Sequence, residues 1–218
     1  MAVLDPIKAN VLAVRLIPNV DRGFAEKMNL RENERSIGFL TADIDDATYT
    51  AIDEATKQAD VRVAYAKSFY AGAGHASGPL SGEIIAILAG PDPAEVRAGL
   101  NAALTYIRDD AYFYSANDNN TIAFFPHLIS RTGSYLSETA GVPLGMPMAY
   151  LIAPPLEATF GIDAALKAAN VTMRVWFNPP SETNFSGALL TGEQAACRAA
   201  CAAFQEAVLD VARNPLKF

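Results

Sequence analysis

The chain has 218 residues, of which 51% are apolar and 19% charged, and its net charge is −7. This composition is typical of a globular protein, either one large domain or two of about 110 residues each. The negative charge and the lack of a basic cluster argue against nucleic acid as a partner. Because Asp5, Lys8 and Arg15 interrupt the first apolar run, we expect neither a signal peptide nor a membrane anchor.

A segment from the first half of the chain returns in the second half. Residues 46–61 read DATYTAIDEATKQADV, and residues 157–171 read EATFGIDAALKAANV. Both carry an acid, Ala, Thr and an aromatic residue, then Ile-Asp, a helical stretch with one Lys, and a final Val. A repeat at this distance predicts two copies of one unit. We therefore expect one domain at 1–110 and a second at 111–218.

The first copy predicts alternating strands and helices. Four strands are expected, at 12–17, 37–42, 61–66 and 83–88. A short helix is expected at 24–30. A longer helix should follow Asp43, Asp45 and Asp46, which could cap it. Asp92-Pro93-Ala94-Glu95 predicts the start of another helix, with Asp92 as its cap. A loop rich in small residues covers 70–82.

The second copy repeats this order after a polar segment at 108–120. Its expected elements are a strand at 121–125, a helix at 134–140, strands at 149–153 and 171–177, a loop at 178–187 and a short strand at 188–190. Thr191–Gln194 predicts a capping box before the last helix. Each copy is therefore predicted to be an α+β unit with helices laid on a mixed sheet.

Residues that commonly carry catalysis are not arranged for it here. Cys197 and Cys201 are one helical turn apart without further ligands nearby, which favours buried thiols in a reducing cytoplasm over a metal site. Neither His75 nor His127 has a nucleophile at a recognisable spacing. The glycine-rich run at 71–78 lacks the spacing of a phosphate-binding loop. We expect no enzyme activity, no metal and no resident cofactor.

The acidic residues differ between the two copies. Asp43, Asp45, Asp46 and Glu83 lie at predicted strand ends and loop edges in the first copy, whereas Pro154-Pro155-Leu156 replaces the first acids in the second. This asymmetry suggests a cation site in one copy. An equally open alternative is that these acids cap a helix and form a solvated face. Phe185, an aromatic residue inside a polar loop, is interpreted as a contact residue that gates or stacks.

These motifs resemble those of a known family. The segment IDAALKAANV, followed by a strand, a Gly-containing loop, a short strand and an Ala-rich helix, is similar to the bacterial microcompartment shell domain. The doubling, together with ISRTGSYLSETAGV, AYLIAPPLEATFGIDAALK and PPSETNFSGALLTGEQAAC, resembles the tandem shell proteins of ethanolamine-utilisation microcompartments over essentially the whole chain.

The resemblance implies a fold of two tandem, circularly permuted shell domains. It also implies a homotrimer that forms a pseudohexameric tile with a gated central pore and small pores in each chain. Such tiles join other shell proteins in the wall of a cytoplasmic compartment. The alternative is a soluble protein that binds or senses ethanolamine or cobalamin and does not tile, and an enzyme ranks third.

The resemblance further implies which residues act. The ethanolamine-binding residues of the small pore would be Asp45, Glu83 and one of Tyr112 and Phe113. Phe185 could stack on cobalamin at the central pore. The pore loops would contribute Tyr70, Gly72, Gly74, His75, Ser181, Thr183, Asn184 and Phe185.

Overall fold

A computed structural model describes residues 2–69, 80–179, 181 and 184–217. The chain divides into two compact units. The N-unit comprises Lys8–Ala111 with Gly133–Leu136, and the C-unit comprises Met1–Ile7, Tyr112–Thr132 and Ser137–Phe218. Each half of the sequence thus gives a short segment to the other unit, which a single boundary after residue 110 does not anticipate.

The N-unit is built on a four-stranded sheet in the order β2-β3-β5-β4. Its strands are β2 (Val11–Ile17), β3 (Ser36–Ala42), β4 (Arg62–Ser68) and β5 (Ile84–Gly90). All three neighbouring pairs are antiparallel, so this sheet is not mixed as predicted. The reason is that β3 and β4 do not pair with each other. Strand β5 lies between them and runs antiparallel to both.

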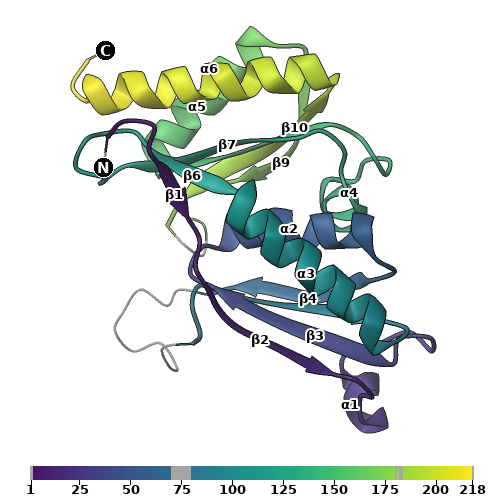
Figure 1. Cartoon of the computed structure of the whole chain (residues 1–218). Helices are drawn as coiled ribbons and strands as arrows, with labels where there is room; N and C mark the ends of the chain where they lie inside the picture. Colours follow the sequence, from purple (N-terminus) through teal and green to yellow (C-terminus); the bar gives the residue numbers. More distant parts are fainter. Residues whose placement is uncertain (1, 70–79, 180, 182–183, 218) are drawn as a thin grey trace. The chain divides into compact units, whose positions relative to one another are not determined.

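Two helices cover one face of this sheet, α2 (Asp45–Gln58) and α3 (Pro93–Asp109), while the short α1 (Arg22–Lys27) joins β2 to β3 (Figure 1). Helix α3 packs closely because β3 has Gly38 beneath it, where a Cβ would lie 2.7 Å from Leu100 Cδ1. The predicted cap is confirmed, since the Asp92 carboxylate accepts hydrogen bonds from the Ala94 and Glu95 N–H groups at 2.8 and 3.0 Å.

The C-unit contains a six-stranded sheet in the order β1-β6-β7-β8-β10-β9. Its strands are β1 (Pro6–Lys8), β6 (Tyr112–Ser115), β7 (Ala123–Ile129), β8 (Met148–Ala153), β9 (Val171–Phe177) and β10 (Ser186–Gly192). The four strands β7-β8-β10-β9 repeat the order of the N-unit sheet, as expected for a duplicated unit. The polar segment 108–120, predicted to mark the boundary between the two copies, contains β6, whose buried Phe113 and Ser115 hold it against β7.

Helices α5 (Pro155–Ala168) and α6 (Gln194–Arg213) pack on this sheet, and α4 (Ser134–Ala140) follows β7. Cys197 and Cys201 are buried in the core with Phe204, which confirms the prediction of core thiols. The predicted capping box is wrong, because Thr191 stays in β10, paired with Met148 and Thr172. Among the described residues, no helix is both long and apolar enough to cross a membrane.

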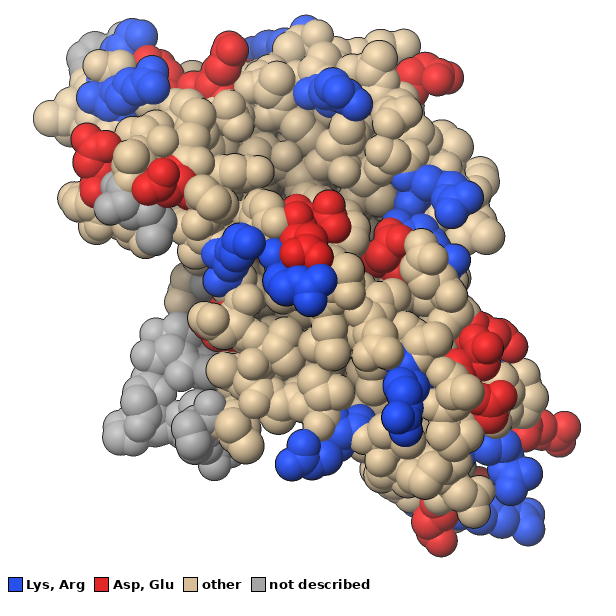
Figure 2. Space-filling model, in the orientation of Figure 1, with Lys and Arg blue, Asp and Glu red and all other residues tan. Residues whose placement is uncertain are grey.

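Charged side chains are scattered over the surface. On the face shown in Figure 2, acidic and basic groups lie in small clusters of both signs, separated by wide uncharged areas. Within the described residues, no group of three His, Cys, Asp or Glu side chains is placed to hold a metal ion.

Candidate functional site

Acidic side chains gather at one end of the N-unit sheet. Ala42, Ile84 and Ser68 are in register across β3, β5 and β4. The residues next to these strand ends, Asp43 and Glu83, therefore lie at the same edge as Ser68. Together with Asp45 in the first turn of α2, they form what we call the acidic cluster, namely Asp43, Asp45 and Glu83.

The predicted role of these acids as helix caps is wrong. Ile44, which has no polar side chain, occupies the N-cap position of α2. Asp43 instead accepts hydrogen bonds from the Asn10 backbone N–H and side-chain amide at 2.6 and 2.7 Å. The Asp45 carboxylate accepts one from the Asp46 N–H at 2.9 Å. Asp43 and Asp45 are thus oriented by these hydrogen bonds rather than by capping the helix.

Gly82 brings Glu83 to the cluster. Its φ is +64°, and a Cβ at this position would overlap the carbonyl oxygen of Ala42. This close approach lets the Glu83 N–H donate to the Ala42 carbonyl at 2.8 Å. A residue with a side chain could adopt neither the dihedral angle nor the contact without strain. Gly82 therefore fixes the start of β5 beside the end of β3.

Asp45 is only 7% exposed. Burial raises its pKa, and hydrogen bonds from the Ser68 side chain and the Asp46 backbone partly offset this effect. Ser68 also shares a hydrogen bond with the Tyr49 hydroxyl at 2.7 Å, and its N–H donates to that hydroxyl at 3.0 Å. Burial raises the pKa of Tyr49 to about 12, with a further contribution from the Asp45 charge. Tyr49 and Ser68 thus lie on the buried side of the acidic cluster, next to Asp45.

Glu83 is half-buried, and its pKa is raised to about 7. Burial is the main cause, and the negative charges of Asp45 and Asp43 add to it. A carboxyl with this pKa exchanges its proton near neutral pH. An approaching cation would favour the charged form and could therefore replace the proton.

The two aromatic candidates belong to the C-unit, whereas Asp45 and Glu83 are brought together in the N-unit. Phe113 on β6 is 5% exposed, and its ring stacks on Phe125 with centroids 4.9 Å apart. Its other neighbour is Phe185, which meets it edge-on at 6.1 Å. Phe113 thus contributes to an aromatic cluster, while its neighbour Tyr112 is half-buried.

Three of the eight predicted pore-loop residues are described. Tyr70, Gly72, Gly74, His75 and Thr183 lie outside the described residues. The Ser181 N–H donates to the Phe185 carbonyl at 2.9 Å, and the Asn184 N–H donates to the Ser181 carbonyl at 3.1 Å. Asn184 has a φ of +65°. These contacts hold Ser181 close to Asn184 and Phe185 just before β10, and Phe185 is half-buried.

The C-unit has the same backbone at this position but different side chains. Asn184 and Phe185 precede β10 as Gly82 and Glu83 precede β5, with φ values of +65° and +64°. Phe185 therefore corresponds to Glu83. Likewise α5 begins with Pro155 where α2 begins with Asp45. The acidic cluster is thus built in one unit only.

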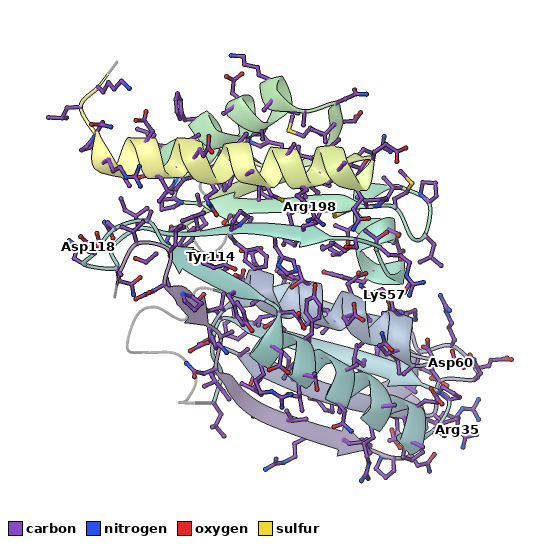
Figure 3. The ribbon with its side chains drawn as sticks, turned by 45° about the horizontal axis from the view of Figure 1, so that its top comes forward. Arg35, Lys57, Asp60, Tyr114, Asp118 and Arg198 are labelled. Carbon is purple, nitrogen blue, oxygen red and sulfur yellow. The ribbon has the colours of Figure 1, made fainter. Side chains whose placement is uncertain are left out.

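Another buried acid, Asp53, was not predicted from the sequence as a site residue. Asp53 on α2 is 0% exposed and accepts hydrogen bonds from the Gly133 and Leu136 N–H groups at 2.7 and 2.8 Å. Lys57, labelled on α2 in Figure 3, lies 3.8 Å from its carboxylate. Burial raises the pKa of Asp53, and the two backbone donors and Lys57 oppose this shift. The Ile-Asp motif in both repeats was the available signal, but it did not reveal these partners.

Comparison with known proteins places these features in a family. A family model described as the BMC domain matches residues 36–118. The bacterial microcompartment shell protein EutL of Salmonella typhimurium is 58% identical over 217 residues, which cover 100% of this chain and 99% of the relative. The chain belongs to the EutL family of shell proteins. EutL of Clostridium perfringens is 59% identical over 214 residues, 98% of this chain and 99% of the relative.

Solved structures agree with this assignment. The crystal structure of EutL from Leptotrichia buccalis matches with a TM-score of 0.97 and 61% identity, covering 100% of both chains. A trimeric microcompartment shell protein, PduB, shares the fold with a TM-score of 0.74 at 21% identity, over 94% of this chain and 89% of that one. EutL relatives are structural shell proteins, so the chain is assigned a structural rather than a catalytic role.

Proposed function

We propose that three copies of this chain form a pseudohexameric tile in the shell of an ethanolamine-utilisation microcompartment in the cytoplasm. In this proposal the tile has a gated central pore, and the acidic cluster lines a small pore that binds or passes ethanolamine. The observation that carries the proposal is the repeated four-stranded unit in a chain of the EutL family. Two similar units per chain give six in a trimer, which matches a hexagonal tile.

Assembly is the first part to test. Heterologous contacts between identical chains close into rings when the rotation between neighbours allows it. Light scattering should therefore give the mass of a trimer, and electron microscopy should show sheets or closed bodies, alone or with other shell proteins. A chain that stays monomeric at high concentration would contradict the tile. It would then favour the alternative, a binding protein or sensor for ethanolamine or cobalamin that does not assemble.

Ethanolamine binding rests on the charge and burial of Asp45 and Glu83. A protonated amine about 4 Å from a carboxylate gains about 4 kcal/mol at an effective dielectric constant of 20, before the cost of desolvation. Desolvation offsets most of this gain, so the expected binding is weak. Weak binding suits a small pore, because a molecule held tightly would block it.

Calorimetry with ethanolamine tests this site directly. The variants Asp45→Asn and Glu83→Gln remove one charge each at nearly constant size, and both should lower the affinity several-fold. Glu157→Gln is the matched control, since Glu157 lies in the first turn of α5 in the C-unit. Parent-like affinity in both test variants would show that the acidic cluster does not bind ethanolamine.

The central pore is the remaining part of the proposal. We assign its gating to the loops at 70–82 and 178–187, and we propose cobalamin as a flat ligand that stacks on Phe185. The half-buried ring of Phe185, held edge-on by Phe113, supports a partly exposed aromatic surface at the start of β10. Phe185→Ala should weaken corrinoid binding measured by absorbance titration. Unchanged binding would remove cobalamin from the proposal.

A further inference from the structure

Helix α2 of the N-unit is covered by a segment from the second half of the sequence. In addition to the two hydrogen bonds to Asp53, the Ser134 N–H donates to Thr56 Oγ1 at 2.9 Å. The Tyr135 ring stacks on Tyr49 with centroids 6.0 Å apart and an interplanar angle of 12°. Leu136 is 2% exposed. The segment Gly133–Leu136 thus contacts three residues on one face of α2, about one helical turn apart, namely Tyr49, Asp53 and Thr56.

In the part of the chain that the structure describes, no such segment covers the matching positions of helix α5 in the C-unit. Both helices have 14 residues and carry the Ile-Asp motif at the same position. Thr159, Asp163 and Leu166 therefore correspond to Tyr49, Asp53 and Thr56. The side chain of Asp163 is 62% exposed, compared with 1% for Asp53.

An open groove lies at these positions. It measures about 290 Å³, and its outer wall is formed by β9, where Trp176 is 53% and Met173 42% exposed. Exposed aromatic and sulfur-containing side chains of this size are typical of binding surfaces. The residues that line the groove are Thr159, Ile162, Asp163, Leu166, Met173 and Trp176.

The counterpart of Gly133–Leu136 in the first half is Asp21–Phe24. Both segments begin at the fourth residue after a strand, β2 or β7. The helices that follow also end alike. The Leu30 N–H donates to the Ala25 carbonyl at 3.0 Å, as the Val142 N–H does to that of Ser137 at 3.0 Å. Asn29 and Gly141, which lie just beyond the ends of these helices, have φ values of 52° and 60°.

This counterpart is exposed, unlike the segment Gly133–Leu136. Phe24 is 45% exposed, whereas the equivalent Leu136 is 2% exposed. The side chain of Arg22, which corresponds to Ser134, is 93% exposed. Among the described residues, the groove between α5 and β9 therefore has no segment bound in it, and the segment Asp21–Phe24 is exposed.

We propose that the segment Asp21–Phe24 of a second copy of this chain docks into the α5–β9 groove. This inference rests on the proposed tile and specifies its contact between chains. The Phe24 ring packs against Leu166 and Trp176, in the way Leu136 is buried against the N-unit. Because each chain offers one segment and one groove, the contact is heterologous and continues around a ring.

The polar part of the contact differs from that at α2. The Asp21 carboxylate already accepts the Phe24 N–H at 3.1 Å, so Asp163 is not required to cap this segment. Arg22 of the second copy stands where Ser134 stands in the other segment, and its guanidinium can pair with Asp163 of the chain that offers the groove. Opposite charges at the rim improve the selection of the correct partner more than the affinity.

Substitutions at the two sides of the contact test the inference. Phe24→Asp and Trp176→Asp should each raise the concentration at which the trimer dissociates by roughly 100-fold, as is typical of central aromatic residues of an interface. Leu216→Asp is the matched control, since Leu216 is 91% exposed in the C-terminal tail. It should leave this concentration within about threefold of the parent. Circular dichroism and thermal melting verify that each variant is folded.

A disulfide test covers the case in which a variant fails to fold. Phe24→Cys and Trp176→Cys proteins are mixed and oxidised, and a covalent dimer should form only in the mixture, because Cys197 and Cys201 are buried. A parent trimer that neither dissociates with Phe24→Asp nor forms the covalent dimer overturns the docking but leaves the tile intact. A monomeric parent overturns both.

Discussion

The N-unit and C-unit share a strand order and a helix of 14 residues, α2 or α5, yet they differ at the end of the sheet. In the N-unit, Glu83 and Asp45 belong to the acidic cluster, and Gly82 precedes Glu83. The corresponding residues of the C-unit are Phe185, Pro155 and Asn184. The shared core residues maintain the fold, while residues at strand ends vary without disturbing it. Duplication therefore allowed one copy to acquire a charged site and the other an aromatic surface.

A second difference concerns Asp53 and Asp163. The same residue at the same helical position is fully buried with two backbone donors in one unit and exposed beside Lys167 in the other. Its energetic role is set by what covers it and not by its own helix. Four experiments test these differences between the two units.

The turn before β5 should be the most sensitive position. Gly82→Ala places a Cβ against the Ala42 carbonyl at positive φ, and we expect a loss of about 4 kcal/mol in the free energy of unfolding from strain and overlap. Its counterpart Asn184→Ala should lose only about 1 kcal/mol, since the left-handed conformation is its main cost. Urea unfolding measures both. Equal losses would mean that the two turns are constrained alike.

The buried aspartate should come next. Asp53→Ala leaves the N–H groups of Gly133 and Leu136 without their acceptor, and we expect a loss of about 3 kcal/mol. Asp163→Ala should lose less than about 1 kcal/mol, because its pair with Lys167 is exposed. Both are measured in the Phe24→Asp background, where the proposed contact between chains is absent. A similar loss at Asp163 would contradict the difference in burial.

The affinity for ethanolamine should depend on pH. The pKa of Glu83 is about 7, so Glu83 is mainly neutral at pH 6 and mainly charged at pH 8. Binding of a cation should therefore strengthen by roughly tenfold over this range, which is about 1.4 kcal/mol. In Glu83→Gln the dependence should disappear, while Glu157→Gln should keep it. A parent affinity that is flat with pH would exclude Glu83 from the site.

The fourth expected effect is on stability as a function of pH. The folded pKa of Glu83 lies above its ordinary value of 4.5, so the folded state binds the proton more tightly than the unfolded state. This contribution is present below pH 4.5 and is lost as pH rises toward 7. The difference in unfolding free energy between the parent and Glu83→Gln should therefore shift against the parent over this window. A shift in the opposite direction would contradict the raised pKa.

Much of the fold could be predicted from local patterns. The helix at 134–140 and the strand at 171–177 match the structure residue for residue, and the Asp92 cap is confirmed. The errors arose where pairing with distant residues overrides local preference. Residues of the polar segment 108–120 pair with β7, and Thr191 stays in a strand instead of capping a helix.

The duplication, the helical and strand periodicities and the family could be recognised without coordinates, because these features depend on residue order alone. The sequence also singled out Asp45 and Glu83, although their mutual approach was only a hypothesis. Packing of the folded chain is what brings Glu83 beside Asp43 through Gly82, adds Ser68 and Tyr49 to the site, and gives Asp53 two backbone donors 80 and 83 residues away. Burial and long-range hydrogen bonds set the charge of a carboxyl, and they exist only after distant segments have packed together.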